Sequence, residues 1–388
     1  MDIEERDRRR SVLFVAIARI TRSVAAGMIN IAFPYYIIVN LHYGASVIGL
    51  IYVAATIATA ALSFLVGVTT DTVGKRSTLL VTSALLPVSA LMVYFAHNLW
   101  MVIPAAMIGG YSATGSLAGG GVGGAVQPVQ NAVLTDLAPK EQRTKYFSIF
   151  SFLAGAAGAG GALLVQFFSI KELFLVSALI AALGIPFLIF VNVVERKGKL
   201  RILKTKSTIG EFSITGILNG FAQGLVIPFL VPFFIITYHL SKSEISVYAF
   251  WSGLIGAFAL LSAPLFERLF GFVKSMIVTR GIGTVLMVLF PIIRFLPFSI
   301  FVYLIAPAFR IAAVPIQQAE LTRRVDDDEV GRALGTNQVA RLVASSAATG
   351  ISGYFIDGAF LEVPFFAYGI IMATNIYLYI RFFGKKNK

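Results

Sequence analysis

Long apolar runs alternate with short polar segments along the whole chain. A helix needs about 20 apolar residues to cross a hydrocarbon core roughly 30 Å thick, and the runs reach that length. Lipid offers backbone groups no hydrogen-bond partners, so each run is expected to be a helix. The predicted fold class is therefore an all-α integral membrane protein. Twelve helices are predicted, over 11–39, 44–69, 77–96, 99–134, 146–168, 172–193, 213–238, 245–265, 275–293, 297–321, 333–356 and 363–383.

Basic residues gather in every second polar connection. One side of the predicted membrane carries most of the 32 Lys and Arg residues, whereas the other carries only Lys171, Lys242 and Arg294. Positive charge stays on the cytoplasmic side, so both termini are predicted to be cytoplasmic, in the plasma membrane. In a soluble protein the net charge of +13 would favour nucleic acid as a partner. Here the membrane topology accounts for it, and no nucleic-acid partner is expected. The first apolar run is too long for a signal peptide, so no cleaved presequence is expected.

The two halves of the chain resemble each other. The segment Phe33-Pro-Tyr-Tyr-Ile-Ile38 returns as Val231-Pro-Phe-Phe-Ile-Ile236. The pattern Pro128-x-Gln-x-Ala-x-Leu-Thr135 returns as Pro315-x-Gln-x-Ala-x-Leu-Thr322. The longest polar connector lies between these repeats. We therefore predict an N-terminal bundle of six helices over 1–193, a cytoplasmic linker over 194–212 and a C-terminal bundle of six helices over 213–388.

The helix predicted over 99–134 is too long for a straight span. The first half has extra residues between its two repeated landmarks, and the glycine-rich stretch Gly115 to Gly124 is the expected insertion. Consecutive glycines weaken a helix, so a kink or an unwound turn is predicted at Gly119-Gly120-Gly121. A backbone-lined substrate site and a packing feature both fit this segment.

A short basic loop joins the second and third predicted helices. Gly67, Asp71, Gly74, Lys75 and Arg76 follow the pattern G-x-x-x-D-x-x-G-[RK]-[RK]. This resembles the loop 2–3 signature of the major facilitator superfamily. The resemblance implies a twelve-helix secondary transporter, built as two six-helix repeats that work by alternating access. It also implies that these five residues control the change between conformations.

Other loop charges are candidates for the same gating role. The second half holds a degenerate copy of the signature, with Glu267, Arg268 and Gly271 at altered spacing. Equivalent loops of the two halves carry Glu141 with Arg143 and Asp328 with Arg332. Intracellular gating salt bridges and solvated loop charges both fit these pairs.

Five arginines lie inside predicted helices, where a charge is costly and usually functional. They are Arg19, Arg22, Arg280, Arg310 and Arg341. Arg22 and Arg310 are the deeper ones, whereas Arg280 and Arg341 lie nearer the inner helix ends, where long side chains can snorkel to headgroups. In the resembling family the first, fourth, seventh and tenth helices line the cavity. The predicted substrate-binding residues are Arg19, Arg22, Asn219, Gln223, Arg310, Gln317 and Arg341. Gating and hydrogen bonding between helices are the alternatives.

Acidic residues are missing from the middle of the predicted spans. A cavity with arginines and no carboxylate is electropositive, and it favours an organic anion as substrate. The carboxylates nearest the spans are Glu320 and Asp357, at helix ends, and they are the candidates for coupling to a proton or counter-ion.

Two other functions stay open. The 33 phenylalanines fit a multidrug or lipophilic-solute proton antiporter working in efflux, although the Gly-Pro that drug antiporters carry is missing from the fifth helix. A non-transporting membrane sensor is the remote alternative. The chain has no cysteine, metal-ligand cluster or nucleophile–base pair, so no enzyme activity, catalytic residue, metal or cofactor is predicted. The expected partners are a small-molecule substrate and the lipid bilayer, with the protein a monomer.

Overall fold

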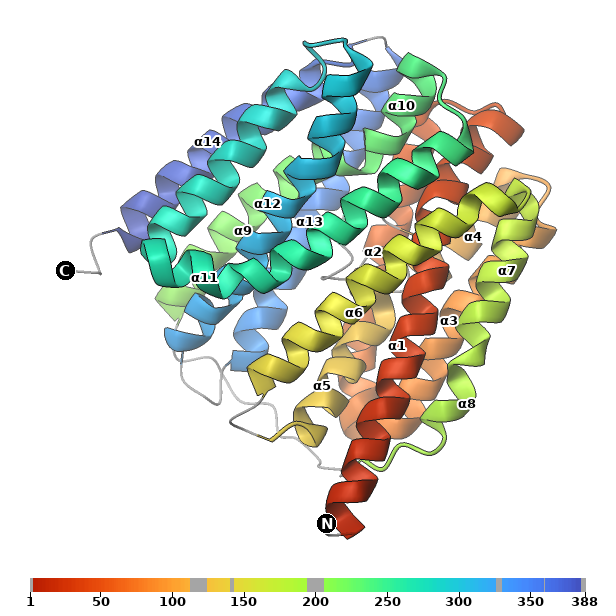
Figure 1. The fold of residues 1–388 in the computed structure, drawn as a ribbon, viewed down its shortest axis with the longest axis vertical. Helices are drawn as coiled ribbons and strands as arrows, with labels where there is room; N and C mark the ends of the chain where they lie inside the picture. Colours follow the sequence, from red (N-terminus) through yellow and green to blue (C-terminus); the bar gives the residue numbers. More distant parts are fainter. Residues whose placement is uncertain are drawn as a thin grey trace. The chain divides into compact units, whose positions relative to one another are not determined.

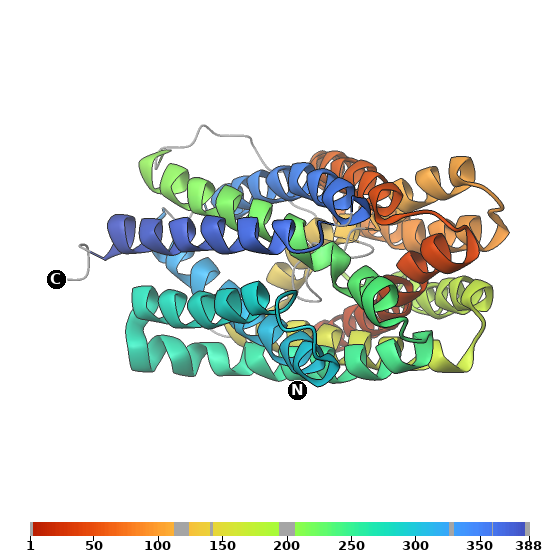
Figure 2. The ribbon, with the colours of Figure 1, turned by 90° about the horizontal axis from the view of Figure 1, so that it is seen from above.

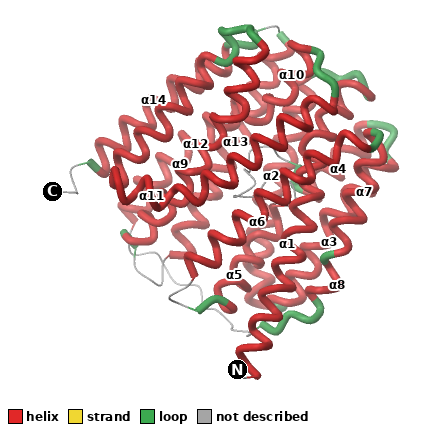
Figure 3. The backbone as a smooth tube through the Cα atoms, viewed as in Figure 1, coloured by secondary structure: helices red, strands yellow, loops and turns green. Residues whose placement is uncertain are grey.

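The computed structural model describes residues 3–111, 124–139, 143–193, 206–325, 330–358 and 360–384. Helices joined by short loops make up these residues, as Figure 3 shows, and the predicted all-α class is confirmed. Short 3₁₀ or π turns extend several of the helices. The α-helices are α1 (Ile3–Tyr35), α2 (Ala45–Thr72), α3 (Lys75–Phe95), α4 (Leu99–Gly109), α5 (Gln127–Leu137), α6 (Arg143–Leu164), α7 (Ile170–Leu183), α8 (Ile185–Leu188), α9 (Lys206–Val226), α10 (Leu230–Tyr238), α11 (Lys242–Leu289), α12 (Leu296–Arg323), α13 (Val330–Asp357) and α14 (Val363–Phe383) (Figure 1).

Most of these helices are long enough to cross a membrane. Within the described ranges, 10 candidate spans are long and apolar enough to cross a bilayer. Large apolar side chains on these spans are exposed; Phe64 is 72% exposed and Ile370 is 71% exposed. Such surfaces would be unfavourable in water and match hydrocarbon. The chain is therefore a multi-pass membrane protein.

The first compact unit comprises residues Met1–His42, Ala54–Lys199 and Leu240–Gly253. Its helix α1 packs on α6 at two glycines. A Cβ built on Gly27 would lie 2.0 Å from the carbonyl oxygen of Gly158, and one on Gly161 would lie 2.0 Å from that of Val24. Only glycine allows two helix backbones to approach this closely.

The second compact unit comprises Tyr43–Val53, Leu200–His239 and Leu254–Lys388. Helix α9 lies against α13 and α14 (Figures 1 and 2). Gly220 and Gly224 face α13, where an added Cβ would lie 2.2 Å from the carbonyl oxygens of Arg341 and Ser345 respectively. The predicted boundaries of the two bundles and of the 194–212 linker stay predictions.

The helix predicted over 99–134 is not continuous, which corrects that prediction. Helix α4 ends at Gly109, and Gly110 adopts the left-handed conformation with φ of +60°. Its backbone N–H bonds to the last carbonyls of α4, which is how glycine commonly terminates a helix. The predicted break at Gly119-Gly120-Gly121 lies outside the described residues. The chain resumes its helix at Gln127.

Two glycines mark corresponding turns in the two halves. Gly74, between α2 and α3, has φ of +112°. Gly271 interrupts α11 with φ of +68°, between the helices predicted over 245–265 and 275–293. Both angles lie where side chains other than glycine are strained. The degenerate copy of the loop signature therefore keeps its glycine turn.

Candidate functional site

A small cavity lies inside the second unit, between α9, α11, α12 and α14. Its lining includes Asn219 and Gln223 of α9, Arg280 of α11, Arg310 of α12 and Tyr368 of α14. None of its lining residues is Asp or Glu. The cavity measures about 20 Å³, which is room for about one water molecule. Sequence-predicted residues from two separate helices meet here.

A chain of hydrogen bonds orders one wall of this cavity. Arg310 Nη1 donates to Gln223 Oε1 over 3.2 Å, and Gln223 Nε2 donates to Asn219 Oδ1 over 3.0 Å. The Nε of Arg310 is buried and has no hydrogen-bond partner among the described residues. Asn219 and Gln223, four residues apart on α9, thus present one polar face to Arg310, as their spacing predicts.

Arg280 is held from two other helices, α12 and α14. Its Nη1 donates to Asn375 Oδ1 of α14, and its Nη2 donates to Gln317 Oε1 of α12 over 2.8 Å. Its guanidinium carbon lies 4.6 Å from the centre of the Tyr379 ring. Asn375 in turn donates to the backbone oxygen of Thr215 on α9 over 2.7 Å. Arg280 is only 5% exposed, so the expectation that it reaches lipid headgroups is wrong.

Arg341 and Gln317 lie beside this cavity rather than on its wall. Arg341 Nη2 donates to Gln338 Oε1 of the same helix over 2.7 Å, and its charge repels those of Arg310 and Arg280. Gln317 contributes by holding Arg280. The sequence pattern left three contributors unidentified: Arg280 as a cavity residue, Tyr368 and Asn375. A buried asparagine within the apolar run of α14 was the available signal for Asn375.

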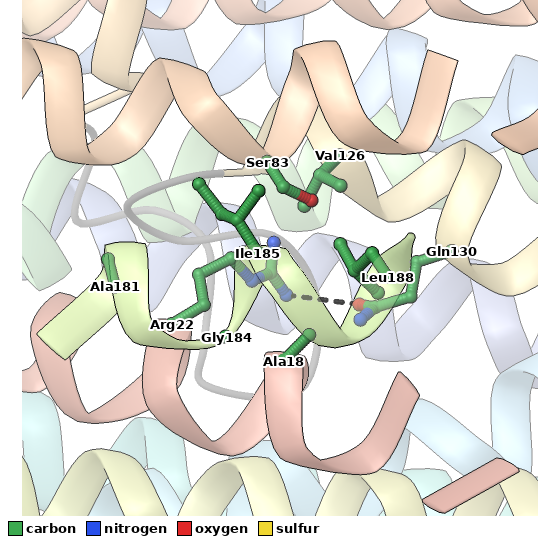
Figure 4. Close-up of a pocket in the computed structure, with 9 residues that line it drawn as sticks. All are labelled: Ala18, Arg22, Ser83, Val126, Gln130, Ala181, Gly184, Ile185 and Leu188. Atoms are coloured by element: carbon green, nitrogen blue, oxygen red, sulfur yellow. Dashed lines mark hydrogen bonds between the residues drawn. The ribbon is translucent and has the colours of Figure 1, made fainter. Parts of the chain in front are cut away.

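The first unit has an arginine cavity of its own. Arg22 of α1 reaches across to α5, where its Nη2 donates to Gln130 Oε1 over 3.3 Å (Figure 4). This cavity measures about 10 Å³, and Ser83 and Ile185 also line it. Arg19 lies one turn away, 3% exposed, with its guanidinium carbon 6.0 Å from the centre of the Phe150 ring. Its Nε has no hydrogen-bond partner in the described part of the chain.

The loop signature forms definite contacts in the first unit. Lys75 forms an ion pair with Asp136 at the end of α5, and Arg76 donates to the backbone oxygen of Ile189. A Cβ on Gly67 would meet no atom within 4 Å, so this glycine is not required by packing in this conformation. Five predicted gating side chains lie outside the described part of the structure: Asp71, Glu141, Arg143, Asp328 and Arg332.

The two coupling candidates both have partners in the second unit. Glu320 Oε1 lies 2.5 Å from Arg324 Nη2, and Glu267 forms a further ion pair with Arg323 nearby. Asp357 accepts from the backbone N–H groups of Ala45 and Ser46 over 2.6 and 2.9 Å. These are the first residues of α2, so Asp357 caps the N-terminus of another helix. A carboxylate is favourable at that position.

Many apolar spans with charged side chains buried among them are the features of a protein that moves solutes across membranes. A family model described as the Major Facilitator Superfamily matches residues 15–349. The chain belongs to the major facilitator superfamily, whose members are transporters of small solutes rather than enzymes. The resemblance expected from the loop signature is thereby confirmed.

Solved structures agree on the fold. The human organic anion transporter TETRAN is 15% identical with a TM-score of 0.71, covering 96% of this chain and 99% of that chain. A bacterial homolog of the human lysosomal transporter Spinster is 15% identical with a TM-score of 0.74, covering 96% and 97%. The D-xylose–proton symporter is also 15% identical with a TM-score of 0.74, covering 96% of this chain and 97% of that chain. At these identities the likeness shows the fold alone. A comparison with curated proteins gave no match.

Proposed function

We propose that this transporter carries a small organic anion across the cytoplasmic membrane by alternating access. The observation that carries the proposal is the cavity of the second unit, lined by Arg280 and Arg310 and by no carboxylate. Guanidinium groups match carboxylate and phosphate oxygens with paired hydrogen bonds. An electropositive cavity also disfavours cations.

The energetics of burial support an anionic ligand. Removing a guanidinium from water costs several kcal/mol unless an opposite charge or good hydrogen bonds offset it. The oxygens of Gln223, Gln317 and Asn375 accept hydrogen bonds from the two arginines but carry no charge. A bound anion would neutralise the positive charge that remains on the guanidinium groups of Arg280 and Arg310. Arg310 would anchor it, and Asn219 and Gln223 would orient it.

The cavity is too small for an organic solute in this conformation. It has room for about one water molecule, so the surrounding helices must separate before a substrate enters. Entry therefore requires these helices to shift within the second unit, in addition to the alternating movement of whole bundles that is typical of this family. The Lys75–Asp136 ion pair and the predicted gating residues around Asp71 would control that movement. Arg22 and Arg19 remain predicted substrate-binding residues of the first unit.

Efflux of lipophilic solutes has less support. One glycine of α6 is used in packing, since a Cβ on Gly161 would lie 2.0 Å from the backbone oxygen of Val24 on α1. Many of the phenylalanines pack against one another; Phe233, for example, lies 4.6 Å from Phe290 between ring centres. Packing therefore explains both observations without a hydrophobic substrate.

Uptake by the Arg310→Gln variant tests the proposal. Proteoliposomes with the wild-type protein should take up labelled organic anions, and the variant should lose most of that uptake while keeping its elution profile and thermal stability. Arg294→Gln is the matched control, because Arg294 is exposed and pairs with Glu362 away from the cavity. Unchanged uptake in Arg310→Gln would remove Arg310 from the site.

A further inference from the structure

We infer that the preferred anion carries two negative charges and that Arg280 selects for the second one. This inference rests on the proposed anion transport and deepens it. It names the substrate class as a small dianion, such as a dicarboxylate or a phosphate monoester. A single carboxylate would be the poorer ligand.

The two arginines reach the cavity from different helices. Arg280 lies on α11 and Arg310 on α12, and both line the same cavity of the second unit. Two guanidinium groups on separate helices can each bind one charged group of a ligand. One carboxylate can neutralise only one of them, and the other would stay buried with its charge uncompensated.

Arg280 is fixed in place without being neutralised. Asn375 and Gln317 accept from its two terminal nitrogens, and the face of the Tyr379 ring lies against it. Amide oxygens and an aromatic face orient a guanidinium but leave its full positive charge. Two of its five N–H groups take part in these bonds, so it keeps donors for a ligand. An arginine with only a structural role could have its charge neutralised by a carboxylate, and Arg280 has none among these partners.

Arg310 differs from Arg280 in how completely it is bonded. Its described bond is to Gln223, and its buried Nε has no partner among the described residues. We therefore assign the first, orienting contact of the anion to Arg310. Arg280 supplies the second charge. The two roles predict different effects of substitution, because loss of Arg310 weakens every anion and loss of Arg280 weakens only dianions.

Succinate and its monoamide succinamate separate these roles, since they have nearly the same shape and differ by one charge. Binding to the purified full-length protein is measured for each by calorimetry. The wild type should bind succinate at least about tenfold more tightly. Arg280→Gln should bind both alike, with succinamate affinity unchanged. Arg280→Lys keeps the charge and should keep most of the preference.

Asn375→Asp tests the same charge without removing the arginine. The new carboxylate has nearly the shape of the amide and would neutralise Arg280 where it lies, so the preference for succinate should fall as in Arg280→Gln. This variant decides the role of Arg280 if Arg280→Gln does not fold. Arg294→Gln is the control that should keep the preference.

The outcomes separate the inference from the proposed function. Equal affinity of the wild type for succinate and succinamate would overturn the dianion preference and leave anion transport standing. Equal weakening of both ligands in Arg280→Gln, or an unchanged preference in Asn375→Asp, would overturn the role of Arg280. Methyl phosphate and dimethyl phosphate form a second test pair, because they also differ by one negative charge. If the wild type binds neither this pair nor succinate and succinamate, both the dianion preference and the proposed anion transport are overturned.

Discussion

At the residue scale, neutral amides stabilise the buried arginines. Asn375 is the most connected of these amides, because its oxygen accepts from Arg280 and its nitrogen donates to Thr215. It joins α14, α11 and α9 through a single fully buried side chain. Each bond it makes compensates a polar group that has no access to water. Such networks are costly to break in part, because the remaining groups stay buried without partners.

Replacement of Asn375 by leucine should therefore destabilise the protein. The charged donor Arg280 would lose its acceptor, at a cost of about 2–3 kcal/mol. The measurement is the free energy of unfolding in mixed detergent. Thr374→Leu is the matched control, because Thr374 is the adjacent residue and is exposed. Similar stability of the two variants would contradict the structural role of Asn375.

At the element scale, close helix packing depends on single glycines. Gly160 and Gly161 are neighbours on α6, yet only Gly161 meets the backbone of α1. A Cβ on Gly160 has no atom within 4 Å. The two positions therefore differ in packing while sharing the same helix and depth.

Alanine at the two positions should have opposite effects. Gly161→Ala places a methyl group against the carbonyl of Val24 and should destabilise the protein by about 1–3 kcal/mol. Gly160→Ala should be neutral or stabilising by up to about 1 kcal/mol, because alanine favours helix more than glycine does. Thermal unfolding of both variants checks this. Equal effects would mean that α1 and α6 pack less closely than described.

The N-terminus of α2 depends on a residue from another helix. Asp357 bonds to the N–H groups of Ala45 and Ser46, so we expect it to act as a cap rather than as the proton-coupling residue. Asp357→Asn keeps a capping side chain and loses the charge, which should cost about 0.3–1 kcal/mol. The dependence of uptake on pH should be the same in Asp357→Asn as in the wild type. A flattened profile would instead make Asp357 a coupling residue.

At the scale of the whole molecule, hydropathy alone predicted the class and nearly all of the helices. The length of each apolar run is set by the thickness of the bilayer. It can therefore be recognised in the sequence without knowing which helices contact one another. The Arg280 network was not predictable in this way. Asn375 is 95 residues from Arg280 and 160 from Thr215, so their meeting depends on how the helices pack. The early end of α4 at Gly109 was missed because one glycine pair looks like many others.

The topology makes its own prediction. Both termini and the 194–212 connector should be cytoplasmic, because basic residues gather on that side. The chain has no cysteine, so Lys197→Cys and Arg294→Cys each introduce a single reactive thiol. In intact cells a membrane-impermeant maleimide should label Arg294→Cys alone. Labelling of Lys197→Cys would show that the connector is outside the cell and that the predicted orientation is wrong.

Transport of matched ions by the wild-type protein tests the central claim most directly. Proteoliposomes would be offered a labelled organic anion and a cationic analogue of the same size, with protein-free vesicles as the background. The buried arginine cavities predict uptake of the anion above background and no uptake of the cation. Uptake of the cation without the anion would contradict the account.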